Sequence, residues 1–122
     1  MVQDKYTIIY NKVKDTLETD QLYLRSDLSL ALLSRIVGTN TVYLSQAINK
    51  KFGCSYRTLI NRYRVNHLIE LARKSDQRVE MIAGKFDFWS RSTFYDVFRQ
   101  VTGMTPHRYM DKIKDESKKY EV

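Results

Sequence analysis

The sequence predicts an all-α protein in which two helix-turn-helix subdomains are joined by a long central helix, with about seven helices in total. Apolar residues recur every three or four positions along most of the chain, which is the spacing of one helix face. The alternation typical of strands is absent, and only four glycines and one proline interrupt 122 residues. We expect a first subdomain over residues 1–55, a linker helix over 56–74 and a second subdomain over 75–122.

Two of the expected helices are long. One covers about residues 4–18 and is followed by a loop over 19–28, and the other begins after Ser55 and is the linker helix. Each places apolar side chains on one face, as a helix that packs against a core does. The inward positions are Tyr6, Ile9, Val13 and Leu17 in the first helix, and Leu59, Ile60, Tyr63, Leu68 and Leu71 in the linker helix.

Two shorter helices between them form the first predicted helix-turn-helix. Ser29 caps the first of these, and Gly38 ends it because glycine tolerates left-handed backbone. Asn40 caps the second, about residues 41–51, and Gly53 closes it. Their predicted core positions are Leu30, Leu33, Val37, Leu44, Ala47 and Ile48.

The same pattern occurs a second time, from about residue 78. Leu30, Leu33, Ser34 and Val37 match Val79, Ile82, Ala83 and Phe86 at an offset of 49, and Asn40, Leu44, Ala47, Ile48 and Gly53 match Ser90, Phe94, Val97, Phe98 and Gly103 at an offset of 50. The change of offset falls within the turn, so the match predicts two copies of one motif. Thr105 and Pro106 begin a last helix that reaches about Lys118, with a frayed tail expected from Lys114 onward.

The formal net charge is +7, and all of the excess lies late in the chain. Residues 1–49 hold five Lys/Arg and five Asp/Glu, whereas residues 50–122 hold sixteen and nine. A basic protein without an apolar stretch long enough to span a membrane favours a polyanionic partner. The single cysteine, Cys54, excludes an internal disulfide framework and fits a soluble, cytoplasmic protein.

The outer faces of the two second helices, about residues 41–51 and 91–102, are polar and are the predicted DNA readers. A major groove admits an α-helix, and side chains there read the edges of bases. The candidate base readers are Thr41, Val42, Ser45, Gln46, Asn49, Arg91, Ser92, Tyr95 and Asp96. Gln46 suits adenine, Arg91 suits guanine, and Asp96 suits the amino group of cytosine. Val42 suits the methyl group of thymine.

Phosphate contacts are expected at helix N-termini and from neighbouring basic side chains, because backbone N–H groups and positive charges attract anions there. Asn40 and Ser90 mark the two N-termini. The candidate phosphate contacts are Asn40, Lys50, Arg62, Lys85, Ser90 and Arg99. For any one of the basic side chains, a solvated surface charge is an equally good interpretation.

The second copy also resembles the signature of the AraC/XylS family of transcription regulators, and the resemblance runs from about residue 4 to 110. In the second copy it is carried by Ile82, Ala83, Phe88, Ser90, Ser92, Phe94, Phe98, Gly103, Thr105, Pro106 and Tyr109. In the first copy it is carried by Leu30, Leu33, Gly38, Tyr43, Leu44, Ser45, Gly53 and Arg64. Three positions depart from it: Asp87 stands where the family has glycine, Ser34 where it has alanine, and Met110 where it has arginine. We expect an altered turn after Phe86.

The resemblance implies a seven-helix, two-subdomain unit that binds double-stranded DNA and regulates transcription, with RNA polymerase as a further candidate partner. Members are normally joined to a sensor or dimerisation region, so the chain is either the C-terminal portion of a longer regulator or a stand-alone member. If both readers bind at once, the linker helix sets their separation at two half-sites about 10 base pairs apart on bent DNA.

The alternative from another class is a helical protein-interaction or signal-relay module with a basic face, and RNA binding is a weaker alternative. Neither explains a duplicated turn followed by a polar outer helix face. No catalytic constellation, cofactor loop or metal-ligand spacing is evident, and His67 and His107 suit surface or packing positions. We therefore expect no enzymatic activity, cofactor or metal. Trp89 suits either the core or the sugar-phosphate backbone.

Overall fold

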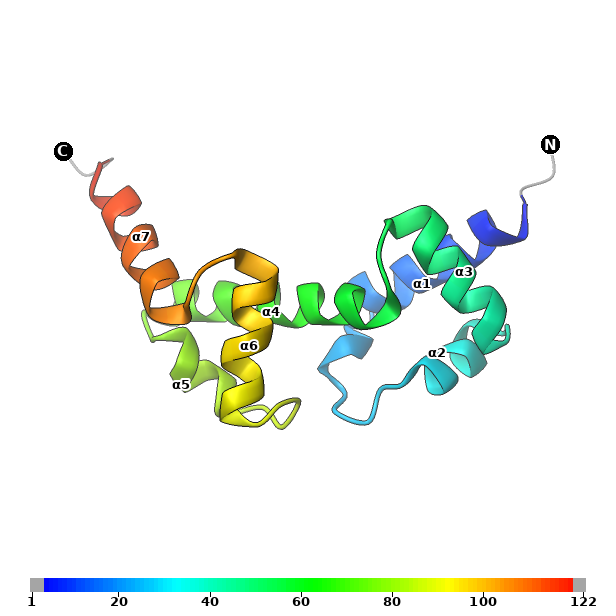
Figure 1. Cartoon of the computed structure of the whole chain (residues 1–122), viewed down its shortest axis with the longest axis horizontal. Helices are drawn as coiled ribbons and strands as arrows, with labels where there is room; N and C mark the ends of the chain where they lie inside the picture. Colours follow the sequence, from blue (N-terminus) through cyan, green and yellow to red (C-terminus); the bar gives the residue numbers. More distant parts are fainter. Residues whose placement is uncertain (1–3, 120–122) are drawn as a thin grey trace. The chain divides into compact units, whose positions relative to one another are not determined.

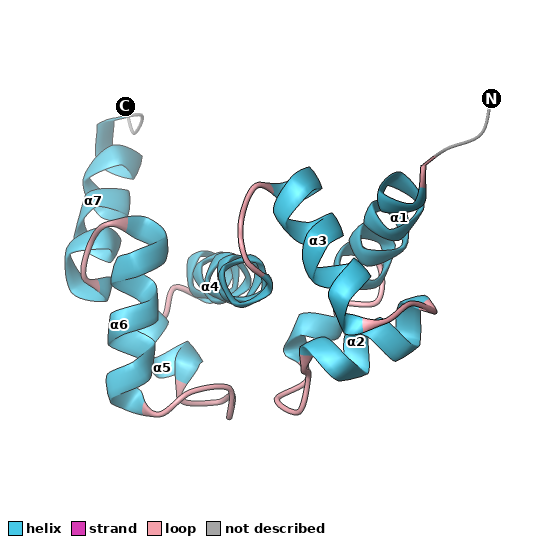
Figure 2. Cartoon of the chain, turned by 45° about the vertical axis from the view of Figure 1, so that its right-hand side comes forward, coloured by secondary structure: helices cyan, strands magenta, loops and turns pink. Residues whose placement is uncertain are grey.

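Every regular element of the computed structural model, which describes residues 4–119, is helical (Figures 1 and 2). The elements, in chain order, are α1 (Lys5–Glu18), a 3₁₀ turn (Leu22–Leu24), α2 (Leu30–Val37), α3 (Thr41–Phe52), α4 (Tyr56–Ser75), α5 (Val79–Ala83), α6 (Arg91–Thr102) and α7 (Pro106–Lys119). Seven α-helices in the described range confirm the predicted fold class. The helix of α7 continues past Lys114, where fraying was expected, and the end of that expected tail falls at 120–122, outside the described residues.

The chain divides into two compact units, Met1–Tyr63 and Arg64–Val122, and the boundary lies inside α4. Each unit has a separate hydrophobic core. The first core contains Ile9, Val13, Leu17, Tyr23, Leu33, Val37, Leu44, Ala47, Ile48, Leu59 and Ile60. The second contains Val65, Leu68, Ile69, Ala72, Val79, Ile82, Phe94, Val97, Phe98 and Met110. Of the predicted inward positions of α4, Leu59, Ile60 and Leu68 are buried, whereas Tyr63 and Leu71 are half-buried.

In the first unit, α1 and α3 pack against each other. Ile9, Val13 and Leu17 recur every four residues and form the buried stripe of α1. The expected loop at 19–28 also contributes to this core, because the 3₁₀ turn inside it buries Tyr23 against Tyr63 at a ring-centroid distance of 5.4 Å. Burial and the nearby Glu18 carboxylate raise the pKa of Tyr63 to about 12, and the Tyr63 hydroxyl donates a hydrogen bond to Glu18 at 3.2 Å.

The two motif copies bury the same positions of their second helices. Over ten positions, residues 41–50 and 91–100 have the same sequence of exposed, half-buried and buried side chains. The buried ones are Leu44, Ala47 and Ile48 in α3, and Phe94, Val97 and Phe98 in α6. Residues 50 positions apart in the two second helices therefore match in burial as well as in sequence pattern.

The first helices of the two motifs end differently. Gly38 ends α2 in the left-handed conformation, with φ of 79°, and its N–H donates to the Arg35 carbonyl. Asp87, at the position equivalent to Gly38, does not adopt a positive φ. Instead α5 stops at Ala83, and Gly84 follows with an ordinary φ of −65°. A side chain at Cβ disfavours left-handed backbone, so the second motif leaves the helix earlier.

The altered turn corrects one detail of the predicted repeat. Phe86, matched to Val37 inside a helix, lies beyond the end of α5 in a turn where its N–H donates to the Ala83 carbonyl at 3.1 Å. It keeps a packing role all the same, because its ring stacks on Phe88 at 5.0 Å.

The other two departures from the family pattern are accommodated within the cores. Ser34 is 4% exposed, and its hydroxyl donates to the Ala31 carbonyl at 2.7 Å, so no polar group of its side chain is left unsatisfied. Met110 is buried in the second core, where a thioether side chain fills apolar space. Within the part of the chain that the structure describes, no helix is both long and apolar enough to cross a membrane.

The contrast between Gly38 and Gly84 predicts opposite responses to alanine. Gly38→Ala should lower the free energy of unfolding by about 1 kcal/mol, because alanine is strained at this positive φ although no atom lies within 4 Å of the added Cβ. Gly84→Ala should be neutral or stabilise by up to about 1 kcal/mol, since its backbone is right-handed and the Cβ meets only ordinary contacts at 3.5 Å or more. Urea denaturation followed by circular dichroism measures both. Equal losses in the two variants would contradict this account of the turns.

Candidate nucleic-acid interface

The outer face of α3 carries four of its five predicted base readers in exposed positions. Thr41, Val42, Gln46 and Asn49 are exposed, and Ser45 is half-buried. Val42 is 60% exposed, which leaves its side chain open to an apolar contact. The Asn49 amide nitrogen donates to the Ser45 carbonyl at 3.0 Å, which leaves its side-chain oxygen and its second N–H free to bond a partner.

The outer face of α6 carries the other four candidates. Arg91, Ser92 and Asp96 are exposed, whereas Tyr95 is half-buried and packs against the second core. The Arg91 guanidinium lies 5.9 Å from the Tyr95 ring, and that ring in turn meets Phe94 edge to face at 5.5 Å. The core therefore holds the ring against which Arg91 lies, which limits the directions that the guanidinium can take.

The N-termini of α3 and α6 are capped in the same way. The Asn40 side-chain oxygen accepts from the Tyr43 N–H at 2.8 Å, and the Ser90 hydroxyl oxygen accepts from the Thr93 N–H at 3.2 Å. These caps fix the first turn of each reader helix. Because the cap oxygens are already engaged, the remaining free N–H groups of the first turn are the donors that an anion would meet.

The four basic side chains expected at phosphates are exposed, and none forms an ion pair within the described residues. Lys50 lies over the Tyr6 ring at 4.6 Å. Lys85 donates to the Gln77 side-chain oxygen at 3.3 Å. With Arg62 and Arg99, they provide charges that no carboxylate in the described part of the chain neutralises by direct contact.

A stretch of the sequence around the first reader contains no acidic residue. Residues 28–69 hold six Lys/Arg and no Asp or Glu. Five of the six are exposed, namely Arg35, Lys50, Lys51, Arg57 and Arg62. The sixth, Arg64, is 8% exposed, and its guanidinium lies 4.5 Å from the centroid of the Phe88 ring. Its side chain therefore packs inside the protein and does not add to the exposed basic surface. The site predicted from the sequence does not include Arg35, Lys51 and Arg57. The absence of acidic residues over 28–69 can be read directly from the sequence and could have pointed to them.

One aromatic residue beside α3, Tyr6, is also absent from the sequence-based site. The Tyr6 hydroxyl of α1 donates to the Gln46 side-chain oxygen of α3 at 2.7 Å. Lys5 lies over the Tyr43 ring at 4.0 Å and over the Tyr6 ring at 5.3 Å. The spacing of apolar residues places Tyr6 on the packing face of its helix and gives no sign that its hydroxyl reaches Gln46, 40 positions away.

Trp89 belongs to the core side of the turn. Its half-buried ring meets Phe88 edge to face at 5.6 Å and stacks on Phe94 at 6.3 Å. Of the two interpretations that the sequence left open for Trp89, these contacts favour the core.

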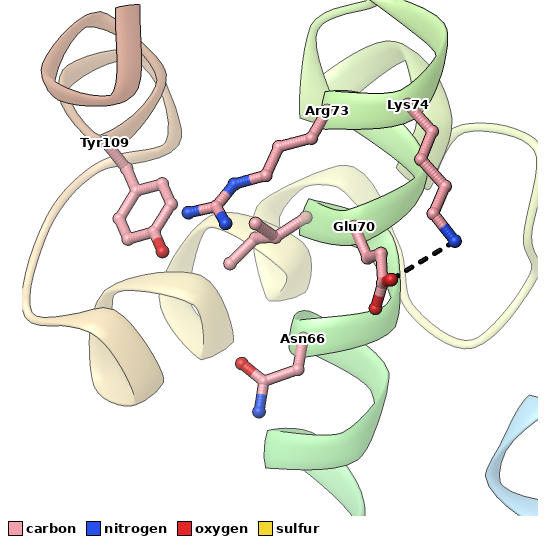
Figure 3. Close-up of a pocket in the computed structure, with 6 residues that line it drawn as sticks. Asn66, Glu70, Arg73, Lys74 and Tyr109 are labelled. Carbon is pink, nitrogen blue, oxygen red and sulfur yellow. Dashed lines mark ion pairs between the residues drawn. The ribbon is translucent and has the colours of Figure 1, made fainter. Parts of the chain in front are cut away.

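The second unit also contains an open groove of about 480 Å³ between α4 and α7 (Figure 3). It is lined by Asn66, Ile69, Glu70, Arg73, Lys74 and Tyr109. Glu70 and Lys74 form an ion pair at 3.2 Å across one turn of α4. The groove holds no paired acids or nucleophile with a base, so its side chains do not form a catalytic constellation.

The described histidines are occupied by contacts within the protein. His107 meets the Arg78 guanidinium at 2.7 Å and the Asp111 carboxylate at 3.1 Å. Burial lowers the pKa of His67, which lies edge-on to Phe86 at 6.2 Å. No group of three or more His, Cys, Asp or Glu side chains in the described range is placed to hold a metal ion.

A duplicated, capped second helix with a polar outer face is the arrangement shared with known proteins. The model of a helix-turn-helix domain family matches residues 33–112, which include the second motif and the first motif from within α2 onward. The chain belongs to the AraC-type helix-turn-helix family. Members of this family are DNA-binding regulators of transcription and are typically not enzymes.

Individual relatives agree with this AraC-type assignment. The regulatory protein PocR of Salmonella typhimurium is 31% identical over 107 residues, covering 88% of this chain and 35% of PocR. An uncharacterised HTH-type transcriptional regulator of Staphylococcus aureus is 28% identical over 99 residues, covering 81% of this chain and 13% of that protein. The chain thus spans between about an eighth and a third of the length of these curated relatives.

Among solved structures, the C-terminal domain of AraT, a response regulator from Geobacillus stearothermophilus, has the same fold. Its TM-score is 0.70 at 22% identity, with 86% of this chain and 84% of that chain covered. A protein of unknown function from Listeria innocua gives a TM-score of 0.65 at 32% identity, covering 84% and 93%.

The caps of α3 and α6 should contribute measurably to stability. Asn40→Ala and Ser90→Ala should each lower the free energy of unfolding by about 1 kcal/mol, because each removes the acceptor of a first-turn N–H. Asn40→Asp is the matched control and should retain stability, since aspartate is an equally good cap and its charge is favoured at a helix N-terminus. Urea denaturation measures all three. Full stability of Asn40→Ala would show that this cap does not hold the start of α3.

Proposed function

We propose that this chain binds double-stranded DNA sequence-specifically to regulate transcription, with α3 and α6 inserted into successive major grooves. One observation carries the proposal: both helices bury the same three positions and expose the same polar face. A helix whose apolar side is occupied by its own core presents the opposite side to a partner, and a major groove is wide enough for it.

The charge distribution supports a nucleic acid as the partner. The acid-free stretch over residues 28–69 surrounds α3 and the start of α4, and five of its six basic side chains are exposed. Neutralising phosphates with Lys and Arg releases counterions and supplies affinity that does not depend on sequence. The N-termini of α3 and α6 add backbone N–H donors at the same faces.

Sequence preference then comes from the exposed side chains of the two helices. Arg91 suits the two acceptors of guanine, and Asp96 accepts from the amino group of cytosine. Val42, at 60% exposure, suits the methyl group of thymine. We further propose a cytoplasmic location and RNA polymerase as a second partner, since regulation of transcription requires access to both the DNA and the polymerase.

The proposal predicts that two substitutions have different effects. Arg91→Ala should weaken binding mainly to sites with one favoured base, by about tenfold or more, because a bidentate contact discriminates by ~1–3 kcal/mol. Lys50→Ala should weaken binding to all sequences about equally and lower the slope of log affinity against log salt by about 1. Sites are first selected from random duplex DNA, and affinities are then measured across a salt series.

The same experiment tests the proposal as a whole. Competition by random duplex DNA and a steep salt dependence are expected of the wild-type protein. Failure to bind any duplex, together with tight binding to an acidic protein surface, would replace this proposal with a protein-interaction module. An equal loss for Arg91→Ala on selected and random DNA would remove Arg91 from the base readers.

The duplication predicts the size of the binding site. Two readers in successive major grooves should protect two half-sites about 10 base pairs apart, with DNA bending contributing to choice between them. Hydroxyl-radical footprinting on a selected site measures the protection. If only one groove is protected, and Arg91→Ala and Ser92→Ala leave affinity unchanged, the second unit has a role other than reading DNA.

A further inference from the structure

The contact between Tyr6 and Gln46 joins α1 to the outer face of the first reader helix. The Tyr6 hydroxyl donates to the Gln46 side-chain oxygen at 2.7 Å, across 40 residues of sequence. Gln46 is exposed, whereas Tyr6 is half-buried and packed against the first core. A half-buried side chain thus holds the amide of an exposed residue on the outer face of α3.

The first core holds the Tyr6 ring, and two ammonium groups lie against it. Lys50 of α3 lies 4.6 Å from the ring centroid, and Lys5 of α1 lies 5.3 Å from it. A cation over the face of an aromatic ring is attracted to it. The ring therefore has two partners of its own, and the hydroxyl is left to hold Gln46.

The hydrogen bond determines which half of the Gln46 amide faces outward. A glutamine that reads adenine must use both halves: its oxygen accepts from the adenine amino group, and its nitrogen donates to N7. Here the oxygen is held toward α1 by the Tyr6 hydroxyl. Among the described residues, none accepts from the Gln46 amide nitrogen, so both of its N–H groups are free, whereas the oxygen, with one of its two lone pairs engaged, is directed toward Tyr6.

From this geometry we infer that Tyr6 is a positioning residue that converts Gln46 from an adenine reader into a guanine reader. Guanine presents two acceptors, N7 and O6, in the major groove, and these match two N–H donors. Adenine presents an acceptor and a donor, and the donor would face the engaged side of the amide. The inference rests on the proposed insertion of α3 into a major groove and specifies one base of the site.

The second motif differs at the equivalent place. Asp96 stands 50 residues after Gln46, and a carboxylate there offers only acceptors. With Tyr6 in place, Gln46 offers donors where Asp96 offers acceptors. The two equivalent positions of the reader helices therefore select opposite base edges, and the two half-sites need not have the same sequence.

The test compares Tyr6→Phe with wild type by selection from random duplex DNA and by affinity for matched duplexes. Phenylalanine keeps the ring, and with it the contacts to Lys5 and Lys50, and removes only the hydroxyl. Wild type should prefer guanine to adenine at one position by about tenfold, and this preference should be absent in Gln46→Ala. In Tyr6→Phe the same position should shift toward adenine by about tenfold, with the salt slope unchanged.

Two further variants separate positioning from structure. Tyr43→Phe is the matched control, since its ring also lies beside Lys5, and it should leave the base preference at that position unchanged. Tyr6→Phe added to Gln46→Ala should have no further effect on base choice, because Tyr6 acts through Gln46. Tyr6→Ala should in addition weaken binding to all sequences, because Lys50 loses the ring beneath it.

Each outcome has a distinct meaning. If Tyr6→Phe selects the same bases as wild type, or changes affinity for all sequences equally, the inference is overturned although DNA reading stands. If Gln46→Ala alters no position, Gln46 does not read a base and the inference is again wrong. If wild type selects no sequence at all, the proposed function has failed before this inference is reached.

Discussion

The rest of this structure depends on the burial of one narrow face of each reader helix. Leu44, Ala47 and Ile48 fill the first core, and Phe94, Val97 and Phe98 fill the second. Once these positions are buried, the 3.6-residue repeat of the helix decides which positions face outward. The polar faces of α3 and α6 are therefore a consequence of how the cores are packed.

The two units satisfy this constraint with different side chains. The first uses aliphatic residues and a left-handed Gly38, so its turn is sharp and needs little support. The second lacks glycine at that position, ends α5 early, and supports the longer turn with stacked rings at Phe86, Phe88 and Trp89. Each aromatic side chain buries a large area, so contacts between these rings can stabilise a turn that lacks the hydrogen bonds of a regular helix.

Helix α1 links the first core to the reading surface. Its Ile9, Val13 and Leu17 are part of the core, while Tyr6, one turn before Ile9, reaches Gln46 on the outer face of α3. The packing of α1 therefore also sets the orientation of a side chain on the reading face. If α3 reads DNA as proposed, a substitution of Tyr6 at the start of α1 should alter recognition without removing a DNA contact, because Tyr6 would act through its hydrogen bond to Gln46.

Much of the fold and part of the site were predictable from the sequence, because the signals that specify them involve residues close together in the chain. Helix periodicity, the caps at Asn40 and Ser90, and the stops at Gly53 and Gly103 depend on nearby residues, and the repeat placed them twice in the same register. The exposed positions of α3 and α6 followed from that register. Only the tertiary structure decided the early end of α5, the burial of Arg64 and the bond from Tyr6 to Gln46. These depend on backbone conformation in a turn and on side chains from separate helices, and no spacing along one helix records such contacts.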